Sequence, residues 1–376
     1  MSVVVGVLKE TAANETRVAL VPEIAAKLKS LGARVLLERG AGAAAHFPDA
    51  LFTDAELSDA STILASADVI LKVQPPTLTE VAALKKGAVI VGFMQAYARP
   101  DLVLALKERG ITAFAMELVP RISRAQSMDA LSSQASVAGY KAALIAANTL
   151  ERFLPMLTTA AGTIRPAAVL VIGAGVAGLQ AIATAKRLGA VVEAYDVRSA
   201  TKDQIKSLGA KFIETGVSAE GAGGYARELT PEEKAKQQEV LDGRIAASDA
   251  VISTASVPGR AAPRIISRAA VARMKAGSVI VDIAAEQGGN CELTKAGETV
   301  LQGGVKIVGP VNLPASLPYH ASEMYSRNLF NFLKPALPKG ELAIDWNDEV
   351  FAGAVLTHDG QIKHEIARAA VEGQKT

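Results

Sequence analysis

The segment from Ala167 to Asp196 constrains the fold more than any other part of the chain. It reads as an apolar strand, a glycine-rich turn, an alanine-rich helix, a second strand and a terminal acid. The turn has the spacing Gly173-x-Gly175-x-x-Gly178, in which the glycines allow a tight bend, close approach to a pyrophosphate and close helix packing, respectively. Asp196 follows the central glycine by about 20 residues, where a carboxylate hydrogen-bonds an adenosine ribose. The segment predicts a dinucleotide-binding Rossmann unit.

Two other interpretations fit parts of this segment. Glycine-rich turns are common, and the uncharged stretch Ala167–Ala185 approaches the roughly 20 apolar residues of a membrane helix. The three glycines and Gln180 inside the stretch argue against a membrane span. We therefore expect a nucleotide site here.

Asp196 also bears on the choice of nucleotide. A 2′-phosphate about 4 Å from its carboxylate would be opposed by about 4 kcal/mol per unit charge at an effective dielectric constant of about 20, which favours NAD over NADP. Arg198 complicates this expectation, because it could pair with a 2′-phosphate. It could equally hold Asp196 in place, since side chains at i and i+2 of a strand share a face.

Length and composition narrow the class of protein. A chain of 376 residues is expected to form two domains, and a net charge of +2 without basic runs argues against a nucleic acid partner. The single cysteine, Cys291, suggests a reducing compartment. The N-terminus lacks the features of a signal peptide, so we expect a cytoplasmic protein without a membrane span of its own.

Short apolar runs alternate with helix-like stretches along most of the chain, which predicts an α/β fold with two Rossmann-like doubly wound parallel-sheet domains joined by long helices. Residues 132–319 form the expected NAD-binding Rossmann domain, and residues 1–131 plus about 320–376 the expected discontinuous N-terminal domain. Ser132–Leu154 is predicted to bridge the domains, and Ser316–Leu333 to be a helix that packs on the first domain. Lys339–Thr376 is polar and shows no clear core element. The strands are predicted at Val3–Leu8, Arg34–Leu37, Val69–Val73, Ala88–Phe93, Thr112–Met116, Ala168–Ile172, Val191–Tyr195, Ala250–Ser253, Ser278–Asp282 and Val305–Val308.

Two loops carry unusual composition. Ser218–Pro231 is rich in glycine and contains one tyrosine, which is typical either of a lid over a site or of a flexible connector. In Pro120–Ser136, Asp129 could accept from a carboxamide, Gln126 could pair with an amide, and Arg121 could hold the carboxylate. A nicotinamide carries such an amide, but the same loop could also be a helix start capped by Asp129 or Ser127.

The residues for other chemistry are sparse. None of the four histidines has metal-ligand spacing with cysteine or carboxylates, so we expect no metal site. No pattern for covalent catalysis is evident. Dehydrogenation of alcohols or amines needs a general base near the hydride donor, whereas hydride exchange between two nicotinamides needs none.

Six motifs together resemble the alanine dehydrogenase and transhydrogenase family over nearly the whole chain, and within it the NAD(H)-binding domain I of proton-translocating transhydrogenases, encoded as a separate alpha-1 subunit. They are GVLKETAANETRVALVPE at 6–23, ILKVQPP at 70–76, RISRAQSMD at 121–129, GAGVAG at 173–178, YDVR at 195–198 and VDIAAEQGGNCE at 281–292. The resemblance places Arg121, Gln126 and Asp129 near the nicotinamide as catalytic residues. It implies further cofactor contacts at Ser132, Val176, Val197, Arg198, Gln237, Thr254 and Ala255, and a mobile-loop tyrosine at Tyr225.

The chain departs from alanine dehydrogenases at two positions: Gln95 replaces a catalytic histidine, and Glu286 replaces an aspartate. Arg17 and Lys72 match positions that hold the substrate carboxylate in those enzymes, or they are buried ion-paired residues that support the cleft. The resemblance implies a homodimer that docks on a membrane-spanning domain II and an NADP(H)-binding domain III, peripheral to the inner membrane. Direct hydride transfer from NADH to NADP+ is the expected activity. The alternatives are a stand-alone amino-acid dehydrogenase and a non-catalytic NAD-binding protein.

Overall fold

The computed structural model describes residues 2–217, 230–256 and 260–373. These form two compact units, Met1–Gln134 with Pro314–Thr376, and Ala135–Leu313. The boundaries expected from the sequence, at 131/132 and about 319/320, lie a few residues away. Helix α5 (Ala130–Thr149) contains the first boundary and carries the chain from one unit into the other.

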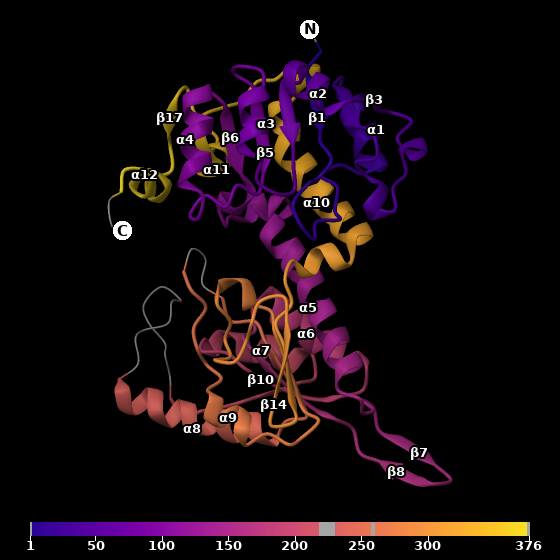
Figure 1. The fold of residues 1–376 in the computed structure, drawn as a ribbon, viewed down its shortest axis with the longest axis vertical. Helices are drawn as coiled ribbons and strands as arrows, with labels where there is room; N and C mark the ends of the chain where they lie inside the picture. The colour runs from indigo at the N-terminus through magenta and orange to yellow at the C-terminus, as the bar shows by residue number, and fades with distance from the viewer. Residues whose placement is uncertain (1, 218–229, 257–259, 374–376) are drawn as a thin grey trace. The chain divides into compact units, whose positions relative to one another are not determined.

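The first unit is built around an eight-stranded sheet in the order β17-β16-β6-β5-β4-β1-β2-β3 (Figure 1). The strands from β6 to β3 are parallel, while β16 and β17 run antiparallel to their neighbours. The strands are β1 (Val4–Val7), β2 (Arg34–Glu38), β3 (Glu56–Ser58), β4 (Val69–Leu71), β5 (Val89–Gly92), β6 (Thr112–Ala115), β16 (Val355–His358) and β17 (Gln361–Ile362). The helices are α1 (Pro22–Ser30), α2 (Ala60–Ser66), α3 (Leu78–Ala83), α4 (Pro100–Arg109), α10 (Pro318–Leu333), α11 (Glu349–Ala354) and α12 (Glu365–Val371).

Helices cover both faces of this sheet, which explains why its strands are continuously apolar. In β4, Val69 and Leu71 belong to the core cluster that contains Tyr325 of α10, while Ile70 belongs to a second cluster. The second cluster includes Leu106 of α4. Alternate side chains of one strand therefore fill two separate cores.

The second unit contains a seven-stranded sheet in the order β11-β10-β9-β12-β13-β15-β14, in which only β14 is antiparallel to its neighbour. The strands are β9 (Ala168–Ile172), β10 (Val191–Tyr195), β11 (Lys211–Phe212), β12 (Ala250–Ser253), β13 (Val279–Asp282), β14 (Thr299–Gln302) and β15 (Val305–Val308). The helices are α6 (Val176–Arg187), α7 (Lys202–Ser207), α8 (Pro231–Ala247) and α9 (Arg268–Ala272). A separate hairpin, β7 (Leu157–Thr159) and β8 (Gly162–Ile164), extends from this unit (Figure 1).

Both sheets confirm the predicted α/β fold with mostly parallel strands. In each, the strand order reverses once, between β1 and β4 in the first unit and between β9 and β12 in the second. Ligands of doubly wound sheets bind beside the carboxyl ends of the strands at this reversal. The topology therefore indicates one candidate position in each unit.

The expectation that Lys339–Thr376 lacks a core element is wrong. Strand β16 pairs antiparallel with β6, and its residues Leu356 and Thr357 are fully buried. Phe351 of α11 joins the aromatic cluster around Phe114 and Phe332. The apolar run of β16 is too short to show a period in the sequence, and its burial depends on a strand more than 200 residues earlier.

The described residues contain no helix that is both long enough and apolar enough to cross a membrane. The uncharged stretch that includes the glycine turn is divided between a buried strand and an amphipathic helix, β9 and α6.

Candidate functional site

The glycine turn between β9 and α6 has the geometry that the sequence predicts. Gly173 has a φ of 92°, a left-handed conformation that favours glycine. A Cβ on Gly178 would lie 1.8 Å from the carbonyl oxygen of Gly173, so only glycine fits there. By contrast, a Cβ on Gly175 would meet no atom within 4 Å, and Gly175 is the N-cap of α6. The backbone is therefore open where a pyrophosphate would face the helix N-terminus.

Asp196 follows β10 directly and is tied to this turn. Its Oδ2 accepts a hydrogen bond of 2.7 Å from the backbone N–H of Ala174. Burial raises the pKa of this carboxyl, but the hydrogen bonds from Arg198 and Ala174 outweigh burial and lower the pKa below its ordinary value. Asp196 is thus held as an anion beside the open end of the turn.

The neighbouring contacts belong to α8, to the start of α6 and to the residue after Asp196. Gln237 of α8 donates its side-chain N–H to the hydroxyl of Tyr195, which joins the helix to the end of β10. Burial and the charge of Asp196 raise the pKa of Tyr195 to about 12, so its hydroxyl stays protonated. Val176 and Val197 are exposed apolar side chains, 41% and 46% accessible. Tyr225, expected on a lid, lies outside the described residues.

Thr254 and Ala255 follow β12 at the strand reversal, beside the turn. Thr254 donates its hydroxyl to the carbonyl oxygen of Gly173 at 3.0 Å. Asn290 holds the next residue in place: its Oδ1 accepts from the N–H of Ala255 at 3.1 Å, and its Nδ2 donates to the carbonyl of Ala255 at 2.8 Å. Asn290 is fully buried. It was not predicted as a site residue from the sequence, although it lies in one of the six family motifs.

The loop with Arg121, Gln126 and Asp129 lies in the first unit. Both oxygens of Asp129 accept from Ser132, from its backbone N–H at 2.9 Å and its hydroxyl at 2.6 Å, so Asp129 caps the start of α5. The expected pairing of Arg121 with this carboxylate is not observed. Within the described ranges, the side chains of Arg121 and Gln126 are exposed and make no hydrogen bond or ion pair. The capping interpretation of Asp129 is therefore observed, and a role for the exposed pair stays a prediction.

Asn328 of α10 holds this loop against the rest of the first unit. Its Nδ2 donates to the carbonyl oxygen of Ser127 at 2.9 Å, and its Oδ1 accepts from the hydroxyl of Ser133 at 2.7 Å. Sequence reasoning missed this residue. The signal was a polar amide within an otherwise apolar helical face, whose partners lie about 200 positions away in the chain.

Arg17 and Lys72, the positions matched to a substrate carboxylate, are buried in ion pairs. Arg17 forms a two-point contact with Glu15, at 2.6 and 2.8 Å, and also donates to Gln134. Burial raises the pKa of Glu15, but the hydrogen bonds and charge of Arg17 and the bond from Gln74 lower it to about 2. The structure thus supports the structural alternative, in which such residues sustain the fold.

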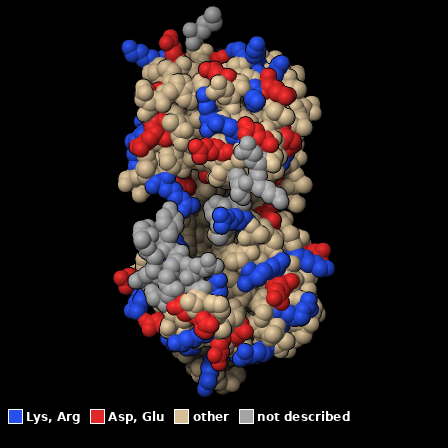
Figure 2. All heavy atoms as spheres, turned by 90° about the vertical axis from the view of Figure 1, so that its left-hand side faces the viewer, with Lys and Arg blue, Asp and Glu red and all other residues tan. Residues whose placement is uncertain are grey.

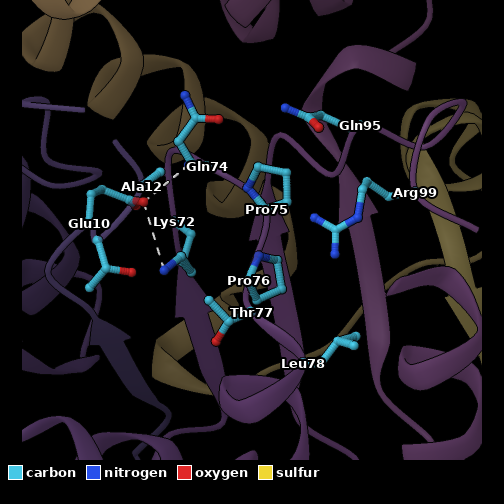
Figure 3. A pocket seen from close by; sticks show the side chains of 11 residues that line it. Glu10, Ala12, Lys72, Gln74, Pro75, Pro76, Thr77, Leu78, Gln95 and Arg99 are labelled. Carbon is cyan, nitrogen blue, oxygen red and sulfur yellow. Dashed lines mark hydrogen bonds and ion pairs between the residues drawn. The ribbon is translucent and has the colours of Figure 1, made fainter. Parts of the chain in front are cut away.

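A pocket of about 370 Å³ lies in the first unit at the reversal between β1 and β4 (Figure 3). Lys72 pairs with Glu80 at 2.8 Å, while the Oε2 of Glu10 is 3.7 Å away. Because Lys72 is nearer to Glu80, it offsets the burial of Glu10 only in part, and the pKa of Glu10 rises to about 7. The pocket is lined by Glu10, Thr11, Ala12, Lys72, Gln74, Pro75, Pro76, Thr77, Leu78, Gln95 and Arg99.

Gln95 enters this pocket from a strained position, with a φ of 51°. Glu117 holds the strained loop, because its carboxylate accepts from the backbone N–H groups of Met94 and Ala96 at 3.1 Å. Burial raises the pKa of Glu117. Gln95 therefore occupies, in a fixed loop, the place where the resemblance puts a catalytic histidine in alanine dehydrogenases.

Charged side chains of both signs are intermingled on the surface that Figure 2 shows. This distribution agrees with the small net charge of +2. It gives no reason to expect a nucleic acid partner.

Comparison with known proteins agrees with this geometry. The family model of the alanine dehydrogenase/PNT N-terminal domain matches residues 6–138, and that of the C-terminal domain matches residues 142–365. The separately encoded first portion of NAD(P) transhydrogenase subunit alpha from Rhodospirillum rubrum is 48% identical over 374 residues, which cover 96% of this chain and 97% of that protein. A transhydrogenase structure from Sinorhizobium meliloti aligns with a TM-score of 0.88 at 46% identity, covering 96% of this chain and 99% of that one. Alanine dehydrogenase of Mycobacterium tuberculosis is 31% identical, with 96% of this chain and 95% of that protein covered.

The chain therefore belongs to the alanine dehydrogenase/PNT family, whose two domains correspond to its two sheets. Within the family it groups with the alpha-1 subunits of NAD(P) transhydrogenases, because its identity to the Rhodospirillum rubrum subunit exceeds its identity to the alanine dehydrogenase. The resemblance inferred from the sequence is confirmed.

Proposed function

We propose that this chain binds NADH and presents its nicotinamide to NADP+ on a partner domain, as the NAD(H)-binding subunit of a proton-translocating transhydrogenase. The observation that carries the proposal is the bond from Ala174 to Asp196, which places a ribose-binding acid beside an open glycine turn. Proton translocation would belong to a membrane-spanning domain II, and NADP(H) binding to a domain III. Both are partner subunits in this proposal.

Hydride transfer between two nicotinamides balances without a proton on the protein. The C4–H bond of NADH breaks, its electron pair and hydrogen pass to C4 of NADP+, and the products are NAD+ and NADPH. The residues of this chain then need only to bind and orient, with the reacting carbons about 3 to 3.5 Å apart. Gln95 fits this requirement, because its amide does not take up a proton at neutral pH.

The described residues suggest a division of roles along the nucleotide. The turn around Gly175 and the N-terminus of α6 would hold the pyrophosphate, and Asp196 the adenosine ribose. The exposed amide of Gln126, with Arg121 and Asp129, would orient the carboxamide. We propose additional contacts from Ser132, Gly173, Val176, Gly178, Val197, Arg198, Gln237, Thr254 and Ala255, and a lid contact from Tyr225.

A homodimer completes the proposal, and the hairpin β7–β8 is the surface that supports it. An isolated two-stranded hairpin is marginally stable in water. This one carries or adjoins exposed apolar side chains, with Phe153 54%, Met156 64% and Ile164 48% accessible. We propose that a second copy of the chain covers these three residues.

A stand-alone amino-acid dehydrogenase fits the first unit less well. Arg17 and Lys72 are already neutralised by Glu15 and Glu80, and a buried cation in such a pair is poorly placed to capture a substrate carboxylate. Ammonia-dependent oxidation of NADH with pyruvate by the isolated chain would favour that activity instead.

Stopped-flow mixing tests the proposal. The chain, loaded with NADH, is mixed with an NADP+-loaded domain III, and the absorbance of each reduced nucleotide or of an analogue is followed. We expect hydride transfer whose rate rises with partner concentration and reaches a plateau. No transfer at any partner concentration, despite NADH binding, would favour a non-catalytic NAD-binding protein.

A further inference from the structure

The carboxylate of Asp196 is fully occupied by groups of the protein itself. Oδ1 accepts from the backbone N–H of Arg198 at 2.8 Å and from its Nε at 2.9 Å. Oδ2 accepts from Nη2 of Arg198 at 2.9 Å and from the backbone N–H of Ala174 at 2.7 Å. A carboxylate offers about four lone-pair positions, so a ribose hydroxyl can bind only if one donor leaves.

The side chain of Arg198 is the donor that can leave. The N–H groups of Ala174 and Arg198 belong to the backbone around the turn and the strand end, and cannot move without distorting both. The Arg198 side chain is 46% exposed, whereas that of Asp196 is 5% exposed. Exposed ion pairs contribute little to stability, so turning the guanidinium into solvent is easy.

We propose that Arg198 determines nucleotide specificity by covering Asp196, and that the ion pair conceals a binding site for a 2′-phosphate. This inference rests on the proposed function, since it concerns the adenosine end of the same nucleotide. The ribose hydroxyls of NADH displace the guanidinium and take its place on Asp196. A 2′-phosphate cannot do so, because the uncovered carboxylate repels it.

The concealed site follows from the shape and charge of the guanidinium. Its planar donors match the oxygens of a phosphate in a two-point contact, and it is always charged. While Asp196 is an anion, this fork is neutralised and turned toward the carboxylate. Removing the charge of Asp196 therefore does two things: it ends the repulsion, and it frees Arg198 to bind the phosphate.

Isothermal titration with NADH and NADPH separates these effects in the full chain. We expect Asp196→Asn to bind NADPH at least about tenfold more tightly than the parent chain. That gain should disappear in Asp196→Asn/Arg198→Ala. It should persist in Asp196→Asn/Lys202→Ala, because Lys202 is a nearby exposed cation that pairs with Glu214 instead. In Arg198→Ala alone, NADH affinity should not fall, since the carboxylate is uncovered.

Equal NADPH affinity in Asp196→Asn with and without Arg198 would overturn the inference, as would a fall of about tenfold or more in NADH affinity in Arg198→Ala. Asp196→Ser provides a second neutral variant if Asp196→Asn does not fold. If the parent chain fails to bind NADH, the proposed function fails. If NADH binds and hydride transfer occurs, but NADPH binding does not depend on Arg198, only this inference fails.

Discussion

Replacing Glu10 by glutamine should change how the stability of the first unit depends on pH. Glu10 is 9% exposed, and its pKa in the folded chain is about 7, against an ordinary value of 4.5. At about 1.4 kcal/mol per pKa unit, this difference corresponds to roughly 3 kcal/mol. Because the folded pKa is the higher one, the folded chain binds the proton more tightly, and the stabilising contribution is fully present below pH 4.5. It is lost as the pH rises through about 7.

Urea unfolding at about pH 5, 6, 7 and 8 measures this change. It is followed by the fluorescence of Trp346, the only tryptophan and a residue of the same unit. Across this range, the free energy of unfolding of Glu10→Gln relative to the parent should rise by roughly 3 kcal/mol. Glu15→Gln is the matched control, because the folded pKa of Glu15 is about 2 and its relative stability should stay constant. Parallel curves for the parent and Glu10→Gln would show that Glu10 does not titrate in this way.

Three further predictions concern binding, assembly and catalysis. Gly178→Ala should lower stability by about 1–3 kcal/mol and weaken NADH binding, because its Cβ meets the Gly173 carbonyl; unchanged calorimetric affinity and melting temperature would argue against this. Met156→Glu should shift sedimentation toward the monomer, whereas Leu301→Glu, at a similarly exposed residue of β14, should not; equal behaviour would argue against the hairpin interface. Gln126→Ala should slow hydride transfer far more than it weakens NADH binding, as measured by stopped flow and titration, and a parallel loss would mean that Gln126 only holds the nucleotide.

Local patterns account for the parts of the fold that were predicted correctly. Strands such as Ala168–Ile172 and Val191–Tyr195 have the predicted bounds, because buried parallel strands are continuous apolar runs between clear breaks. The glycine turn was predictable because each glycine answers a local steric need. The first is left-handed, the second faces open space and the third touches the turn.

Other parts depend on contacts between distant residues, which no local pattern shows. Asn290 and Asn328 each hold a loop through hydrogen bonds to partners far away in the chain. Strand β16 is buried only because β6 lies beside it. The choice between the two roles of Arg198 also needed coordinates, since the sequence shows only that it shares a face with Asp196.

Isotope transfer distinguishes direct passage of hydride between the two nicotinamides from any indirect route. The chain is loaded with NADH deuterated at the transferable C4 position and mixed with an NADP+-loaded domain III in ordinary water. If this chain presents the nicotinamide for direct transfer, the NADPH formed carries the deuterium at C4 in full. NADPH without deuterium, or no NADPH despite bound NADH, would be incompatible with the proposed role.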